Sequence, residues 1–183
     1  MRIRFAVVLT VAVALAACND GLGPQPWDAT PDTVSLYTAS RPDLLGLPSG
    51  YDFVNLTPVR VEANSAAGNW DVVLTGQGPM QMVPAGAFQG QTSRAGIATI
   101  TNQGFDALAK APTDTAAFSA QPVTLAEGGV YVVRSRRAPC SFSTAVHYAK
   151  VLVLRVDAAS GLVRMAVVRN PYCNDRSFVP PTN

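Results

Sequence analysis

The chain has 183 residues, with 14 Lys and Arg against 12 Asp and Glu, which gives a formal net charge of +2. This balance does not indicate a nucleic-acid partner, and the length suits one domain with a hydrophobic core. The sequence contains one histidine, His147, and no Gly-x-Ser-x-Gly, His-Glu-x-x-His, Cys-x-x-Cys or phosphate-binding glycine-rich motif. Nothing in the sequence therefore argues for an enzyme.

The first eighteen residues are typical of a bacterial lipoprotein signal. Arg2 and Arg4 precede an uncharged apolar run at residues 5–17. This run is shorter than the ~20 residues of a membrane-spanning helix but has the length of a signal-peptide core. Its end, Leu-Ala-Ala-Cys at residues 15–18, resembles a lipobox. We expect residues 1–17 to be removed and Cys18 to carry lipid; the alternative is an ordinary secretory signal with an incidental cysteine.

Residue 19 is Asn, whereas Asp at this position retains lipoproteins at the inner membrane in enteric-type sorting. We therefore expect a lipid-anchored protein of the bacterial cell envelope, at the outer membrane, with the membrane itself as a partner. Residues 18–32 contain several Gly and Pro and no apolar period, which predicts a flexible tether. Residues 33–183 are expected to form a single domain.

Most of the domain consists of short segments with the pattern of β-strands. Alternating or β-branched apolar residues predict strands at 51–54, 59–62, 70–74, 80–83, 97–101 and 130–134. Residues 85–96 are small, polar and Gly-rich, which predicts a long exposed loop. Residues 105–111 are the one helix-like stretch, and Pro112 ends it.

A hairpin is predicted near the C-terminus. The β-rich run at residues 145–156 and a returning strand at 162–168 flank a turn, in which Gly161 suits a positive φ. Apolar residues occupy both faces of these strands, which indicates a central position in a sheet. We predict an all-β fold of antiparallel sheets with at most one or two short helices.

Two cysteines remain if Cys18 is lipidated. Outside the cytoplasm, a pair such as Cys140 and Cys173 normally forms a disulfide. The alternative is a reactive thiol or a soft-metal site.

Charge is distributed unevenly along the chain. Residues 18–129 contain 4 basic and 10 acidic residues, whereas residues 130–183 contain 8 basic and 2 acidic ones. The two halves could pair across one fold, or an arginine-lined face could receive an anion. Arg134 and Arg136 would share one strand face and Arg137 would lie on the other. Arg134 and Arg136 are candidate anion anchors, with solvated sheet surface as the alternative.

Three side chains are candidate ligands for a haem iron or another metal. His147 lies in a β-rich run, where it is either a strand histidine or a metal ligand. Met80 and Met82 are two residues apart and so share a strand face. They are either core residues or axial thioether ligands.

The order of several segments resembles the HmuY-like family of haem-binding lipoproteins. The segments are Tyr-Asp-Phe-Val at 51–54, Val-Arg-Val at 59–61, Trp-Asp-Val-Val-Leu at 70–74, Phe-Asp-Ala-Leu at 105–108 with Ala-Pro at 111–112, Val-Tyr-Val-Val-Arg at 130–134, and the C-terminal hairpin. The resemblance covers residues 51–169 and implies an all-β domain on a lipid anchor.

In that family, haem is coordinated by two side chains, His or Met. The resemblance therefore implies a binding protein for haem, or for another hydrophobic anion, with His147, Met80 and Met82 as candidate ligands. A single histidine does not allow a two-histidine site within one chain. The alternative is a non-catalytic structural or interaction lipoprotein that does not bind haem, with an unknown protein partner.

Overall fold

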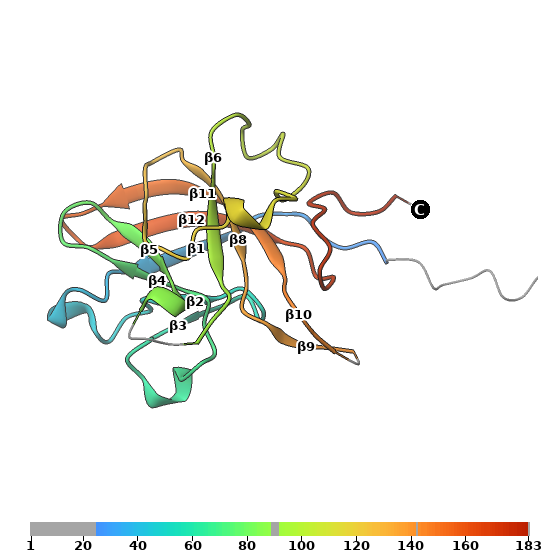
Figure 1. The fold of residues 1–183 in the computed structure, drawn as a ribbon. Helices are drawn as coiled ribbons and strands as arrows, with labels where there is room; N and C mark the ends of the chain where they lie inside the picture. The colour runs from blue at the N-terminus through green and yellow to red at the C-terminus, as the bar shows by residue number, and fades with distance from the viewer. Residues whose placement is uncertain (1–24, 89–91, 142, 183) are drawn as a thin grey trace, which may run out of the picture.

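The computed structural model describes residues 25–88, 92–141 and 143–182, and in these ranges the chain folds into strands joined by turns and short helices (Figure 1). One five-stranded sheet has the order β1 (Asp32–Tyr37), β12 (Leu162–Arg169), β11 (Tyr148–Asp157), β8 (Val130–Arg134) and β6 (Gly96–Ile100). A second has the order β3 (Thr57–Val59), β2 (Gly50–Asp52), β4 (Val72–Thr75), β5 (Gln81–Pro84) and β7 (Val123–Thr124).

The remaining two strands, β9 (Ala138–Cys140) and β10 (Ser143–Ala145), form a separate hairpin. Every pair of strands is antiparallel. The helices of the described residues are three-residue 3-10 turns: η1 (Pro42–Leu44), η2 (Asn64–Ala66), η3 (Ala85–Ala87) and η4 (Thr115–Ala117). The predicted all-β, antiparallel fold is confirmed.

The predicted C-terminal hairpin is the centre of the larger core. β11 pairs with β12 on one side and with β8 on the other, so neither hairpin strand is an edge. Gly161 in the connecting turn has φ +69°, and a Cβ there would lie 2.8 Å from side-chain atoms of both Thr38 and Leu44. Only glycine fits this conformation and this space without strain.

The two five-stranded sheets enclose the main core. Val151 on β11 and Met165 on β12 pack there with Phe53, which follows β2, and Leu74 on β4. All four side chains are at most 1% exposed. The opposite side chains of β12, such as Val168, belong to a second apolar cluster. The five-stranded sheet of the hairpin is therefore covered on both faces, which explains its apolar run.

The predicted helix at residues 105–111 is wrong. The segment makes one helical hydrogen bond, from Leu108 N to Gly104 O at 3.1 Å. The ammonium of Lys150 donates instead to the carbonyl oxygens of Phe105 (2.9 Å) and Leu108 (3.4 Å). A helix this short is marginal on its own. Here the ammonium of Lys150, which is distant in sequence, binds two backbone carbonyls of the segment. The side chains of Phe105 and Leu108 cover the outer face of the sheet.

The start of the described chain packs on the domain. The side chains of Trp27 and Ala29 contact the second apolar cluster, and the Tyr172 hydroxyl donates to Gln25 O at 2.6 Å. Gln25, Trp27 and Ala29, which lie within the flexible tether that the sequence predicts over 18–32, therefore contact the domain. The first described residues and the C-terminus lie at the same end of the molecule (Figure 1).

Three sequence predictions fall wholly or partly outside the described ranges, and one of them is the tether, of which residues 18–24 are not described. The signal peptide and Cys18 lie in residues 1–24. Among the described residues, no helix is long and apolar enough to cross a membrane. The loop expected at 85–96 is described except for residues 89–91, and its ends are not exposed, because Ala85 and Ala95 are 1% and 2% exposed.

Candidate functional site: an arginine-lined pocket

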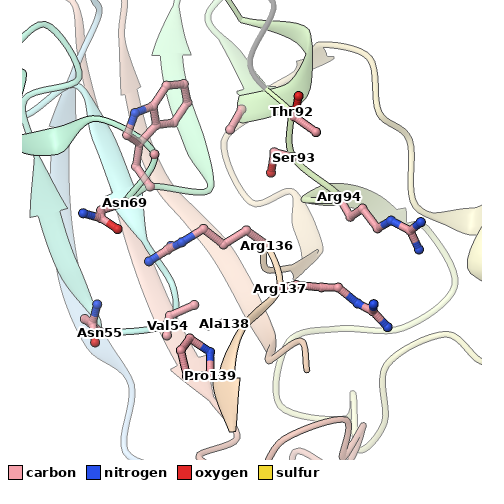
Figure 2. A pocket seen from close by; sticks show the side chains of 13 residues that line it. Val54, Asn55, Asn69, Thr92, Ser93, Arg94, Arg136, Arg137, Ala138 and Pro139 are labelled. Carbon is pink, nitrogen blue, oxygen red and sulfur yellow. The ribbon is translucent and has the colours of Figure 1, made fainter. Parts of the chain in front are cut away.

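An open pocket of about 720 Å³ lies where several connections between the strands meet (Figure 2). This volume is within the usual range for small-molecule sites, roughly 300–1,000 Å³. Connections supply most of the lining: Val54 and Asn55 after β2, Gly68, Asn69 and Trp70 before β4, Ala85 at η3, Thr92, Ser93 and Arg94 before β6, and Arg136 and Arg137 between β8 and β9. Ala138 and Pro139 on β9 complete it. None of the described lining residues is acidic.

Two of the three arginines in the lining have no counter-charge. Within the described residues, the guanidinium groups of Arg94 and Arg137 form no ion pair and no hydrogen bond with another side chain. Both side chains extend toward the same side of the pocket (Figure 2). A guanidinium group presents several donors in a planar arrangement that matches carboxylate and phosphate. The site therefore has the chemistry of an anion-binding site.

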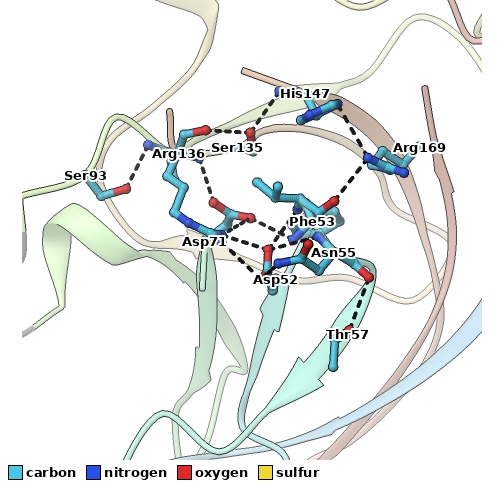
Figure 3. A network of polar contacts seen from close by, with 12 residues as sticks. Asp52, Phe53, Asn55, Thr57, Asp71, Ser93, Ser135, Arg136, His147 and Arg169 are labelled. Atoms are coloured by element: carbon cyan, nitrogen blue, oxygen red, sulfur yellow. Dashed lines mark hydrogen bonds and ion pairs between the residues drawn. The ribbon is translucent and has the colours of Figure 1, made fainter. Parts of the chain in front are cut away.

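The third arginine of the lining, Arg136, is bound to two carboxylates, Asp52 and Asp71 (Figure 3). Its Nη1 donates to Asp52 Oδ1 at 2.7 Å and to Asp71 Oδ2 at 3.2 Å, and its Nη2 donates to Asp52 Oδ2 at 3.1 Å. Asp52 ends β2, Asp71 directly precedes β4, and Arg136 follows β8. The three charges thus join the two five-stranded sheets next to the pocket.

The two carboxylates differ in their electrostatic environment. Burial raises the pKa of Asp52, but the hydrogen bonds from Arg136 and Asn55 outweigh it, so this pKa lies below the usual 3.8. Asp71 is 0% exposed, and burial raises its pKa despite bonds from the backbone N–H groups of Arg136 (2.6 Å) and Phe53 (2.7 Å). These bonds occupy both oxygens of Asp71, which makes it a structural group.

His147 is linked to Arg136 through Ser135 and so belongs to the same polar network (Figure 3). Its backbone N–H donates to Ser135 Oγ at 2.8 Å, and Ser135 Oγ donates to Arg136 O at 2.7 Å. The imidazole Nδ1 lies 3.4 Å from Asn170 O and 3.5 Å from Arg169 Nη1, and Nε2 lies 3.8 Å from Cys173 Sγ. Burial, followed by the positive charge of Arg169, lowers the pKa of His147 below 6.5.

The lowered pKa of His147 predicts a pH-dependent stability. Above pH 6.5 the imidazole is neutral in both states, whereas below it the unfolded chain takes up a proton more readily. The free energy of unfolding should therefore fall as the pH decreases from about 7.5 to about 5.5. Urea unfolding at the two pH values measures this fall. His147→Gln should flatten it, and equal slopes in both proteins would contradict the assignment.

The candidate haem ligands do not fit this pocket. Met80 and Met82 are each 1% exposed and pack in the main core. Of the two alternatives for these residues, the structure thus places them as core residues. His147 is 6% exposed and lies among Asn170, Arg169 and Cys173. None of the three lines the pocket, and the described residues contain no cluster of three or more His, Cys, Asp or Glu side chains placed to hold a metal ion.

Of the two arginines predicted as anion anchors, Arg136 lines the pocket and Arg134 does not. Arg134 does not line the pocket; its guanidinium group lies 5.1 Å from the centre of the Phe118 ring, and its Nε donates to Arg94 O at 3.2 Å. Arg136 lines the pocket but is bound to Asp52 and Asp71. β8 ends at Arg134, so the two-residue period used to place Arg136 and Arg137 does not extend to them.

The predicted disulfide is confirmed. Cys140 on β9 is bonded to Cys173 in the C-terminal segment, and the two Cα atoms are 6.4 Å apart. Ala138 and Pro139, on the same strand, form part of the pocket wall. The bond therefore fixes this wall to the C-terminal segment.

The sequence did not identify Arg94 as a pocket residue. It placed Arg137 on the strand face opposite Arg134 and Arg136 and did not mark it as an anion anchor. It also overlooked the acidic pair, although a signal was present. Asp52 and Asp71 each interrupt a short apolar run, and an acid in such a run is rarely buried without a partner.

Comparisons with family models, with curated proteins and with solved structures find no match to this chain.

Proposed function

We propose that the chain is a lipid-anchored, extracytoplasmic binding protein, without catalytic activity, that holds a negatively charged ligand at Arg94 and Arg137. One observation carries the proposal: Arg94 and Arg137 are both lining residues of the pocket, and no described carboxylate pairs with their guanidinium groups. The other arginine of the lining is neutralised, since Asp52 and Asp71 bind it. An anion would supply the counter-charge that the first two lack.

The strength expected of such contacts suits reversible binding. A hydrogen bond to a charged group contributes about 1.5–3 kcal/mol, and two arginines can each bind an anion in bidentate fashion. Because Arg94 and Arg137 are exposed, salt should weaken the attraction. We do not assign iron-ligating haem to this pocket, because none of the candidate donors Met80, Met82 and His147 lines it.

The first test compares the thermal melting of variants in the presence of anions. Phosphate, citrate and glucuronate each stabilise the folded state if they bind to it, so at least one should raise the Tm of the wild-type protein. Arg94→Gln and Arg137→Gln should each remove most of the rise. Arg164→Gln, which removes an exposed arginine outside the pocket, is the matched control.

Two results would contradict the proposal. If no anion raises the Tm, the chain is better described as an interaction lipoprotein without a ligand. If all four proteins respond equally, the anions act through the general charge of the surface.

The anchor is supported by the signal sequence and by residues 15–18, which resemble a lipobox. Cys18→Ser should abolish lipid labelling and release the protein from the outer-membrane fraction, because the acyl chains supply the membrane affinity. Metabolic labelling with a fatty acid and fractionation measure both effects. Unchanged labelling would contradict the lipobox, and recovery of the wild-type protein in the inner membrane would contradict the sorting.

A further inference from the structure

The neutral part of the pocket lining carries amide and hydroxyl groups beside its apolar side chains. Asn55, Asn69, Thr92 and Ser93 supply these groups. Among the described residues, the side chains of Asn69 and Thr92 have no hydrogen-bond partner, and Asn55 uses only its Nδ2, which donates to Asp52 Oδ2 at 2.7 Å. Donors and acceptors thus remain unsatisfied except by solvent in this part of the pocket.

The described lining presents no exposed aromatic ring on which an apolar ligand could stack. Its one aromatic lining residue, Trp70, is 1% exposed and packs edge-on against Phe88, with ring centres 5.8 Å apart. The remaining apolar lining consists of valine, alanine and proline side chains. An apolar anion placed here would take water from the asparagine amides without replacing its hydrogen bonds, and that loss is costly.

The two kinds of polar group occupy different sides of the pocket. Figure 2 shows Asn55 and Asn69 on one side and the guanidinium groups of Arg94 and Arg137 on the other. A ligand that satisfies both sides has an anionic group at one end and hydroxyl groups along its body. Amides pair well with hydroxyls, because each amide both donates and accepts.

Building on the proposed function, we infer that the ligand is an acidic saccharide, with its carboxylate or phosphate at Arg94 and Arg137 and its hydroxyls at Asn55 and Asn69. The volume of about 720 Å³ leaves room for more than one sugar unit. The carboxylate and the phosphate share the same arginine chemistry, so both forms of the anion are tested.

Calorimetric titration of the full-length lipidated protein in detergent can test this class of ligand. The four probes are trigalacturonate, neutral galactotriose, galactose 6-phosphate and suberate, an aliphatic dicarboxylate without hydroxyls. Trigalacturonate or galactose 6-phosphate should bind at least tenfold more tightly than galactotriose and than suberate. Whichever of the two acidic sugars binds more tightly identifies the anionic group.

Two variants separate the contribution of the asparagine amides to binding from that of the arginines. Asn69→Leu should weaken binding of the acidic sugar by roughly 3- to 10-fold, which is the value of one or two neutral hydrogen bonds, and should leave binding of suberate unchanged. Arg137→Gln should weaken the binding of every anion. Arg164→Gln is the control for the loss of one positive charge, and melting curves verify that each variant is folded.

The inference and the function on which it rests fail in different ways. If suberate binds as tightly as the acidic sugars, or Asn69→Leu weakens both equally, the saccharide class is wrong and anion binding stands. If galactotriose binds as tightly as trigalacturonate, the arginines do not recognise the ligand. If no probe binds, the proposed function and the inference both fall.

Discussion

Replacing Arg136 with methionine is expected to lower the free energy of unfolding by about 3–5 kcal/mol, the usual cost of removing one partner from a buried ion pair. The substitution leaves Asp71, which is 0% exposed, and Asp52, which is 3% exposed, without their guanidinium partner. Methionine keeps much of the aliphatic volume of the arginine. The loss therefore reports the uncompensated charges rather than a cavity.

The pH dependence of this variant provides a second readout. Without the arginine, both buried carboxylates should have a folded-state pKa above the unfolded value of 3.8. A raised pKa makes the folded state more stable at low pH and less stable as the pH rises through the folded pKa. The defect should be largest at neutral pH and smaller at about pH 4.

The control is the triple variant Arg136→Met/Asp52→Asn/Asp71→Asn, which removes all three charges together. It should recover part of the lost stability, since the penalty comes from unpaired charge. Urea unfolding measures every variant. A loss below about 1 kcal/mol for Arg136→Met, which is the value of an exposed ion pair, would contradict a structural role for the network.

Removing the disulfide should have an effect of similar size. The double variant Cys140→Ser/Cys173→Ser should be less stable by about 2–5 kcal/mol. The bond closes a loop with a sequence separation of 33, for which the chain-entropy model gives about 3–4 kcal/mol. Urea unfolding of the variant, and of the wild-type protein with and without a reductant, measures the loss.

The disulfide should also influence the pocket. β9 carries Cys140 together with Ala138 and Pro139 of the pocket wall, and the bond ties this strand to the segment of Cys173. Reduction should therefore weaken anion binding under conditions in which the domain remains folded. Identical stability of the reduced and oxidised proteins would contradict the expected contribution of the bond.

Strand-level features of the fold could be predicted because they depend on local patterns. The hairpin of β11 and β12 follows from two apolar runs around a turn with Gly161, and the structure places it at the centre of a sheet. The failure at residues 105–111 has a tertiary cause. Lys150, which is distant in sequence, takes the carbonyl groups that a helix would need.

The site was less predictable, because connections between strands supply most of its lining. Arg94 precedes β6 and Arg137 lies between β8 and β9, so no period of a strand relates them. The uneven charge of the chain allowed either pairing of its two halves or an arginine-lined face. Among the described residues, carboxylates of the acidic half bind one of the three pocket arginines, Arg136. The structure therefore contains both an ion-pair network between the two halves, at Arg136, and the exposed pocket arginines Arg94 and Arg137.

The most direct test of an anion site at Arg94 and Arg137 is a titration followed by the NMR signals of the arginine Nε–H groups, assigned by single arginine substitutions. Addition of galactose 6-phosphate or glucuronate to the mature protein should shift the signals of Arg94 and Arg137 until they saturate. The signal of Arg136 should change little, because Asp52 and Asp71 hold its guanidinium group. If instead no arginine signal shifts, or only those of Arg155 and Arg164 outside the pocket do, the anion site does not exist.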